Sequence, residues 1–327
     1  MPERIRRFSI ESSALLLFTA VTAFAWVPLL QPGLPRGHDT LDQTFRAVQR
    51  FEALRDGDLT ARWVADMPAG LGYAVFHYYP PAASVLTALG MQGGLDVVAA
   101  VRAVYLACLV ASAAGAYLLV RRTYGPVAGW CGALFYGTGP YVLADIYARG
   151  AIAESLSLAL LPWIVLAVET AVARDTPLRR AAVIAGIAAL TVTHLVILLL
   201  AAPVVGVRLL LAAAKDRALL RRLGACGLIG VVLGASFWLP AILDLGLVRA
   251  GELTGRGYDL TANLLPLAEV VEMRATHPLG PDRPRFQAAL IPTVLACMGA
   301  VLLLLRGSGT RATSAFWTGV LLISLLF

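Results

Sequence analysis

The sequence predicts an all-α protein that crosses a membrane several times, and three features of the chain indicate this. Hydrophobic residues make up 59% of its 327 residues and charged residues 14%, whereas a soluble domain has about 45–50% and about 25%. The apolar residues gather in long runs, and the basic residues gather between alternate runs. This composition excludes an ordinary soluble enzyme and a disordered chain.

Most of the apolar runs have close to the ~20 residues that a helix needs to cross the ~30 Å hydrocarbon core of a bilayer. They lie at about 12–30, 97–119, 126–143, 152–170, 181–214, 223–243 and 288–305, and the last starts near 313. The run at 181–214 is too long for one crossing and is basic on both flanks, so we interpret it as two short helices that meet near His194. The segment from Pro80 to Met91 is too short to cross, which predicts a re-entrant or interfacial segment.

The basic residues predict which side of the membrane each loop occupies. With Arg4, Arg6 and Arg7 placed in the cytoplasm, the inner side holds 15 basic and five acidic residues, and the outer side holds 12 basic and 15 acidic residues. The positive-inside rule expects this asymmetry. We therefore predict a multi-pass protein of the cytoplasmic membrane with a cytoplasmic N terminus, and no nucleic-acid partner.

The predicted organisation is a single polytopic module over residues 1–327, with a first outer loop at 31–96 and a later outer loop at 244–287. Because the chain stops inside the apolar run from Leu321 to Phe327, we expect the sequence to be truncated at its C terminus. In the first loop, apolar residues recur at steps of three and four from Leu41 to Leu54. This spacing predicts an amphipathic helix on the membrane surface.

Asp39, just before that helix, has two compatible interpretations. It can be the N-cap of the helix with Asp42 as its capping-box partner. It can also be a carboxylate held at the membrane boundary, available as a general base or a metal ligand. His38 beside it is either an exposed loop residue or a ligand.

A second outer segment, near 144–151, carries three ionisable residues at the mouth of an otherwise apolar bundle: Asp145, Arg149 and Glu154. Charges at such depth cost a few kcal/mol or more unless they are paired or hydrated, so they mark candidate sites. The structural alternatives are an ion pair between Asp145 and Arg149 at i,i+4 spacing and stabilisation of a helix N terminus by Glu154.

Three further residues are candidates for contact with a substrate. His194 opens toward the outer face by the same count, and its alternative role is a hydrogen bond between helices. Tyr78 and Tyr79 are either substrate contacts or part of an aromatic belt at the lipid headgroups. The chain contains no Gly-rich phosphate loop, two-His zinc helix or serine elbow.

Several of these stretches together resemble a known family. They are Gly37-His38-Asp39, the run from Gly57 to Trp63, Gly70-Leu71-Gly72-Tyr73, Tyr78-Tyr79-Pro80-Pro81, Asp145 through Gly150 to Glu154, and Thr193-His194. The sequence is similar to bacterial membrane proteins with the GT-C glycosyltransferase fold, in particular the group related to 6-pyruvoyl-tetrahydropterin synthase and YfhO-like proteins. The resemblance covers residues from about 33 to 195.

This resemblance implies a GT-C-like helical bundle with a large first extracytoplasmic loop, in the bacterial inner membrane. It implies a transferase that moves a sugar from a polyprenyl-phosphate donor to an envelope glycan, lipid or protein on the outer face. The position that matches the family's catalytic base or metal ligand is Asp39, and Asp145 matches the second acidic residue. The catalytic candidates are Asp39, Asp145 and Glu154, and the substrate-binding candidates are His38, Arg149, His194, Tyr78 and Tyr79.

The expected chemistry is deprotonation of an acceptor hydroxyl by a carboxylate, while Arg149 stabilises the departing phosphate. The family's acidic pair also suits a divalent metal, although the first loop has no Asp-x-Asp, because Asp42 lies three residues after Asp39. The alternative function is a non-catalytic transporter or assembly partner for lipid-linked sugars. The nearly charge-free spans weigh against transport of a polar headgroup.

Overall fold

The structure is a computed structural model that describes residues 3–67, 69–212, 216–249, 298–299 and 315. Within these residues it is helical and contains no strand, only an isolated bridge between Val64 and Tyr73. The chain divides into two compact units, one of Met1–Ala61 with Ala82–Leu166 and one of Arg62–Pro81 with Ala167–Phe327.

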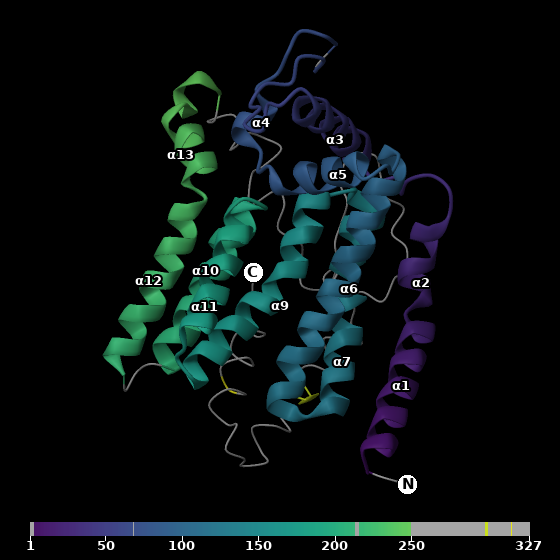
Figure 1. The fold of residues 1–327 in the computed structure, drawn as a ribbon, viewed down its shortest axis with the longest axis vertical. Helices are drawn as coiled ribbons and strands as arrows, with labels where there is room; N and C mark the ends of the chain where they lie inside the picture. Colours follow the sequence, from purple (N-terminus) through teal and green to yellow (C-terminus); the bar gives the residue numbers. More distant parts are fainter. Residues whose placement is uncertain (1–2, 68, 213–215, 250–297, 300–314, 316–327) are drawn as a thin grey trace. The chain divides into compact units, whose positions relative to one another are not determined.

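The first unit holds the N-terminal helices and the start of the long helix α9. Its elements are α1 (Glu3–Val21), α2 (Ala23–Trp26), the 3-10 helix η1 (Val27–Leu30), α3 (Thr40–Arg55), α5 (Ala82–Gln92), α6 (Val97–Tyr124), α7 (Pro126–Gly137), α8 (Pro140–Ala144), the π-helix η2 (Asp145–Arg149) and α9 (Ile152–Ala173) up to Leu166. Helices α6 and α7 lie side by side, and α3 packs on α5 (Figure 1).

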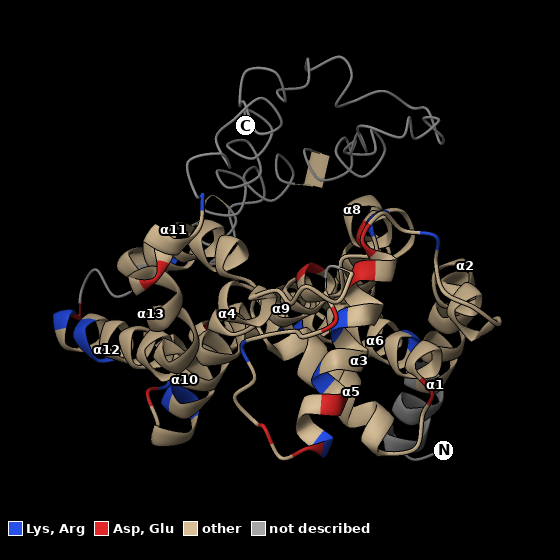
Figure 2. Ribbon diagram, turned by 90° about the horizontal axis from the view of Figure 1, so that it is seen from above, with Lys and Arg blue, Asp and Glu red and all other residues tan. Residues whose placement is uncertain are grey.

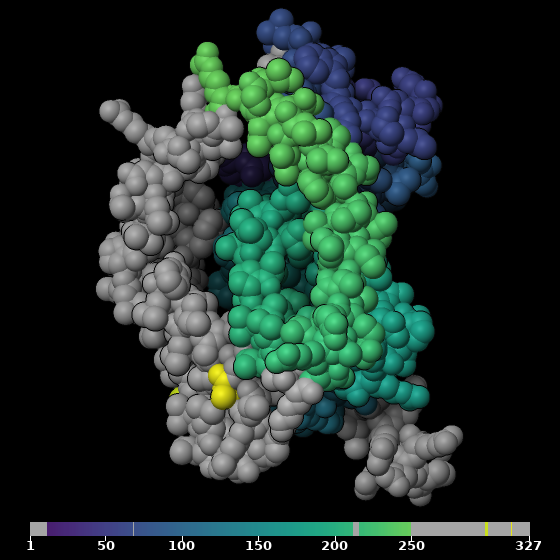
Figure 3. All heavy atoms as spheres, turned by 90° about the vertical axis from the view of Figure 1, so that its left-hand side faces the viewer, coloured from purple at the N-terminus to yellow at the C-terminus, as the bar shows by residue number. Residues whose placement is uncertain are grey.

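The second unit holds the end of α9 and the helices that follow it. Its elements are α4 (Val75–Tyr78), α10 (Pro177–Thr191), α11 (Leu195–Ala212), α12 (Arg217–Leu233), α13 (Ala235–Leu243) and the 3-10 helix η3 (Leu245–Leu247). Helix α12 is followed directly by α13, and the two are coloured green in Figure 3.

Two described helices are long and apolar enough to cross a membrane, namely α6 and α9. Two further pairs qualify only when each is counted as one bent span: residues 12–30, bent by 56°, and residues 217–243, bent by 67°. The described part of the chain therefore has two candidate spans, or up to four with the bent pairs. The predicted runs at 288–305 and from 313, and most of the loop at 244–287, lie outside the described residues.

The predicted span at 126–143 is interrupted, which corrects that prediction. Helix α7 ends at Gly137, and α8 starts at Pro140. Proline has no N–H to continue the helix, and it forces the preceding residue out of the helical region. Gly139 accordingly has an extended ψ of 142°.

The apolar run at 181–214 forms two helices, as predicted. The run divides into α10 and α11, with the break at Val192, Thr193 and His194. The segment predicted at Pro80–Met91 contains the apolar helix α5, which at 11 residues is too short to cross a bilayer, as predicted; its re-entrant or interfacial position stays a prediction.

Helix α3 confirms the predicted amphipathic helix, but its apolar row is not the row that packs against the rest of the unit. Thr40, Gln43 and Arg50 are buried, and Arg50 Nη1 donates to the Ala61 carbonyl over 3.0 Å. The apolar Leu41 is 83% exposed. The buried row, which also contains Ala47 at 0% exposed, thus fixes the helix to the protein. Part of the predicted apolar row is left to face its surroundings, as expected for a helix on a membrane surface.

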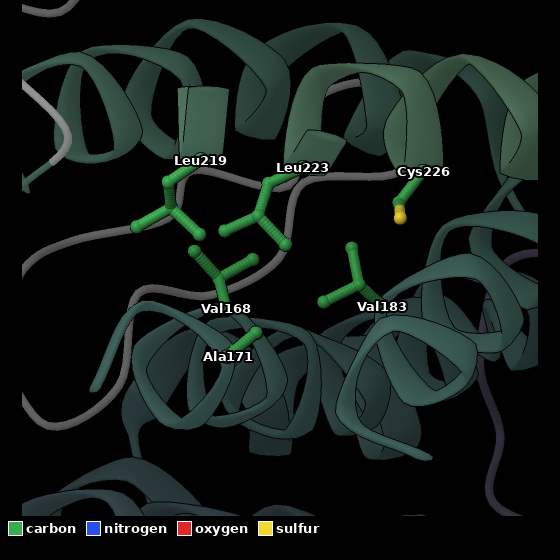
Figure 4. Close-up of a cluster of buried hydrophobic side chains, with 6 residues drawn as sticks. All are labelled: Val168, Ala171, Val183, Leu219, Leu223 and Cys226. Atoms are coloured by element: carbon green, nitrogen blue, oxygen red, sulfur yellow. The ribbon is translucent and has the colours of Figure 1, made fainter. Parts of the chain in front are cut away.

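The second unit is held together by a small apolar core. Val168 and Ala171 of α9, Val183 of α10, and Leu219, Leu223 and Cys226 of α12 are buried against one another (Figure 4). Helix α12 begins where the Asp216 side chain accepts hydrogen bonds from the N–H groups of Ala218 and Leu219. This cap fixes the register that turns Leu219, Leu223 and Cys226 to the same side of the helix.

Truncation in this core should destabilise the protein far more than the same truncation on the outside of the same helix. Leu223 is 3% exposed and Leu228 is 66% exposed. We expect Leu223→Ala to cost about 2–5 kcal/mol, because it removes buried contacts and leaves a cavity. Thermal unfolding in detergent measures this, with Leu228→Ala as the matched control. Equal losses in the two variants would contradict the described core.

Candidate functional site

The backbone joins the two outer segments that the sequence analysis singled out. The N–H of His38 donates to the Ala148 carbonyl over 3.1 Å, and the N–H of Asp39 donates to the Arg149 carbonyl over 2.6 Å. These hydrogen bonds bring the start of α3 to the end of the π-helix within the first unit. The two segments that carry the candidate residues Asp39 and Asp145 therefore lie next to each other.

Two glycines permit this close approach. Gly150 has φ +72°, a conformation that other residues adopt at a cost. A Cβ at Gly150 would lie 2.2 Å from the Thr40 Oγ1, and a Cβ at Gly37 would lie 2.4 Å from the Gly150 nitrogen. The Thr40 hydroxyl also accepts a hydrogen bond from the Gly37 N–H over 3.1 Å. Any side chain at either glycine would push the two segments apart.

Asp39 occupies the N-cap position of α3, but its side chain makes no capping hydrogen bond. The capping interpretation, with Asp42 as box partner, is therefore wrong, and Asp42 instead pairs with Arg46 at 2.6 Å. The Asp39 carboxylate lies 2.5 Å from His38 Nδ1, and the two side chains are 37% and 75% exposed. Because Asp39 has no capping role, its carboxylate is accessible for chemistry.

Arg149, whose carbonyl accepts the hydrogen bond from Asp39, has its guanidinium between two carboxylates. Its Nη1 is 2.7 Å from Asp145 Oδ1 and 2.6 Å from Glu154 Oε2. The predicted ion pair between Asp145 and Arg149 is confirmed, and Glu154 joins the same cluster. Figure 2 shows acidic and basic positions next to one another beside α8.

Tyr141 completes this acid–arginine cluster, and the sequence analysis missed it. Its hydroxyl donates to Glu154 Oε1 and accepts from Arg149 Nη1 over 3.2 Å. The signal available in the sequence was the distance from Tyr141 to Asp145 and Arg149, four and eight residues, which places all three on one side of a helix. The π-helix that follows α8 is a rare element that is frequent at functional sites.

Asp145 is fully buried, and this changes its protonation. The pKa of its carboxyl is raised from 3.8 to about 7, chiefly by burial and then by the neighbouring Glu154 charge, against the lowering effect of Arg149. Asp39 also raises this pKa, so the two acids interact electrostatically. Among the described residues, Asp145 Oδ2 has no hydrogen-bond partner. A protonated Asp145 leaves Glu154 and Arg149 as a neutral pair.

The other three candidates lie in the second unit. The Tyr78 hydroxyl donates to the Asp244 carbonyl over 2.8 Å, and the adjacent His77 Nε2 lies 2.9 Å from Asp244 Oδ2. The Tyr79 N–H donates to the Val75 carbonyl. His194 Nδ1 accepts from the Ile197 N–H over 3.3 Å, so it caps the start of α11.

A metal site built from the protein's own side chains is not found in the described part of the chain. No three His, Cys, Asp or Glu side chains there are arranged to hold a metal ion. The Arg149 guanidinium occupies the position between Asp145 and Glu154, where a cation shared by the two carboxylates would sit.

Fold and site together describe a helical membrane protein with an acid–arginine cluster next to an accessible aspartate. The sequence matches the family described as the 6-pyruvoyl-tetrahydropterin synthase related domain, a membrane protein, over residues 73–326. Because this match covers most of the chain, the protein belongs to that family of membrane proteins. The matched range includes Asp145, Arg149 and Glu154 but not His38 or Asp39. No curated protein matches the chain.

The glycine contact can be tested by comparing two alanine substitutions. Gly150 and Gly33 both have positive φ, but a Cβ at Gly33 would meet nothing within 4 Å. Both substitutions impose a similar backbone cost, about 1–2 kcal/mol, whereas Gly150→Ala adds a clash with Thr40, worth about 1–3 kcal/mol. Thermal unfolding of the two variants in detergent should separate them. Equal stability would mean that the two segments are not in contact.

The raised pKa of Asp145 predicts a dependence of stability on pH. The folded protein keeps a proton on Asp145 that the unfolded chain releases between about pH 4 and about pH 7, so the free energy of unfolding falls as pH rises through this window. Asp145→Asn keeps an oxygen for Arg149 but cannot ionise. The variant should therefore lose the part of the pH-dependent fall in the free energy of unfolding that Asp145 causes. Unfolding midpoints from about pH 5 to about pH 8 measure it. A decline of the same size in the variant would contradict the assignment.

Proposed function

We propose that this protein is a glycosyltransferase of GT-C type. It transfers a sugar from a polyprenyl-phosphate donor to an envelope glycan, lipid or protein on the outer face of the bacterial inner membrane, with the N terminus in the cytoplasm. The observation that carries the proposal is the accessible Asp39 carboxylate, held by backbone hydrogen bonds beside the acid–arginine cluster.

Asp39 is the proposed general base. It is exposed enough to reach an acceptor hydroxyl, and its backbone is fixed on one side by Arg149. A positioned carboxylate that removes the hydroxyl proton as the oxygen attacks the anomeric carbon contributes about 10²–10⁴-fold to a rate. His38 Nδ1, 2.5 Å from the carboxylate, is placed to orient Asp39 or to accept the proton from it.

Arg149 is the proposed partner of the departing phosphate. A cation is needed where negative charge develops on the leaving group. When Glu154 and Asp145 are both ionised, the two acids and Arg149 carry a net charge of −1, and protonation of Asp145 brings the cluster to neutrality, which lowers its repulsion of an anion. The raised pKa of Asp145 thus supports a site that accepts an anionic donor. Tyr141 holds Glu154 in place through its hydroxyl.

The exposed apolar residues of helix α3 also support the proposal, because the donor is attached to the membrane. Leu41 and Phe45 of α3 are exposed, whereas Thr40, Gln43, Ala47 and Arg50 are buried, and the helix packs on α5. A helix with that arrangement lies at the lipid headgroups, the level at which a lipid-linked phosphate is found.

The proposal is tested with full-length protein in liposomes that contain a mixed set of polyprenyl-phosphate sugars and candidate acceptors. We expect the wild type to release free polyprenyl phosphate, measured by mass spectrometry. Asp39→Asn should lower the release about 10²-fold or more, because the base is lost. Asp42→Asn, three residues further along the same segment, is the matched control and should stay close to wild type.

Equal release by wild type and Asp39→Asn would remove Asp39 from the mechanism. Release by neither, from folded protein with the acceptors present, would contradict the transferase and favour the non-catalytic transporter or assembly partner.

A further inference from the structure

The first unit contains an apolar groove that the acid–arginine cluster does not use. Its volume is about 510 Å³, and it lies between α1–α2 on one side and α6–α7 on the other. Leu15, Phe18, Thr22 and Trp26 line one wall. We propose that this groove binds one acyl chain of a membrane phospholipid, whose phosphate is held by Arg102 at the end of the groove.

The lining requires a hydrocarbon occupant. Its threonine hydroxyls donate to carbonyls of the preceding helical turn: Thr19 to Leu15, Thr22 to Phe18 and Thr138 to Leu134. Their hydrogens are therefore already used within the helices, and the rest of the lining is almost entirely apolar. An empty groove would lose dispersion contacts along both walls. In a bilayer, lipid chains supply these contacts.

The dimensions fit a single chain. On α6 the lining runs from Leu106 to Tyr117, which is about 16 Å at 1.5 Å per residue. Dividing the volume by this length leaves a cross-section of about 30 Å². That is room for one hydrocarbon chain with carbon contacts near 4 Å, and it is far too narrow for a helix of about 10 Å diameter.

Three aromatic residues that line the groove, Phe18, Tyr117 and Trp130, pack against one another. The ring centroids of Phe18 and Trp130 are 5.2 Å apart, and those of Tyr117 and Trp130 are 4.6 Å apart. From Arg102 to Tyr117 the distance along α6 is about 22 Å, close to half of a bilayer that is about 40–45 Å thick with its headgroups. This length suits an acyl chain of one leaflet and not a much longer polyprenyl chain.

Arg102 marks the headgroup position. It lies one helical turn before Leu106, and its Nη1 donates to the carbonyl of Gln31, the residue after η1. Its buried Nε has no hydrogen-bond partner among the residues that the structure describes. A guanidinium with an unpaired N–H at the end of an apolar groove fits a phosphate with a chain below it.

The occupant would also support the candidate site. The Tyr147 hydroxyl, in the π-helix, donates to the Ala25 carbonyl over 2.7 Å, and Ala25 lines the groove. A chain in the groove therefore supports the α2 segment on which part of the π-helix rests.

The test uses full-length protein in vesicles that contain a phosphatidylglycerol with a photoreactive acyl chain, and labelled peptides are mapped by mass spectrometry. We expect labelling of the groove in the wild type. Val110→Trp should lower it about tenfold, equivalent to 1.4 kcal/mol of lost binding, because the ring fills the groove. Val127→Trp is the matched control, because Val127 is similarly exposed, 77% against 69% for Val110, and does not line the groove.

The phosphate contact is tested in the same vesicles. Arg102→Gln should lower labelling by the phospholipid about fivefold, as expected for one interfacial cation, and leave labelling by an uncharged photoreactive diacylglycerol unchanged. Arg122→Gln, at the other end of α6, should have no effect. Equal labelling in Val110→Trp and Val127→Trp would overturn the groove assignment. Labelling by a photoreactive polyprenyl phosphate, but not by the phospholipid, would contradict the proposal that the groove binds a phospholipid acyl chain.

Discussion

The contact between Gly37 and Gly150 is the constraint on which the candidate site depends. Two backbone hydrogen bonds and two missing side chains let residues 37–39 run against the end of the π-helix. The contact holds Asp39 beside Arg149, although more than a hundred residues separate them in the chain. Because the backbone of Asp39 fixes its position, its carboxylate is not needed as a helix cap and stays 37% exposed. A loop residue held in this way is preorganised without being buried, as catalysis requires.

The second constraint is electrostatic. Asp145 is fully buried, and a buried ionised carboxylate is costly unless it is paired. Arg149 offsets this cost, but Glu154 competes for the same guanidinium nitrogen. The result is a cluster in which the proton on Asp145 is held up to about pH 7. Perturbed acids of this kind gather at functional sites, although structural ion-pair networks perturb them too. The accessible Asp39 beside the cluster favours a functional site.

Much of the fold could be predicted from the sequence, because helices leave periodic or uninterrupted apolar patterns. The long helices α6 and α9, the break near His194 and the amphipathic α3 follow from such patterns. The interruption before Pro140 was not predicted, because the run at 126–143 is uncharged throughout and was assigned as one span on that ground. The site was harder: counting spans gives the side of the membrane for Asp39 and Asp145 but no distance between them. The two segments that carry these residues meet through a contact between glycines and through a π-helix. Neither feature produces a repeating pattern that can be recognised in a single sequence.

In the structure the start of α3 lies against the π-helix, and disulfide trapping tests this contact directly. Cysteines are introduced at His38 and Ala148 in a background without the four native cysteines, because the backbone at these positions is joined by a 3.1 Å hydrogen bond. Under mild oxidation in the membrane, the account predicts a 38–148 disulfide in the double variant, identified as a linked peptide by mass spectrometry. Two thiols that both react with a maleimide but never form that disulfide would contradict it.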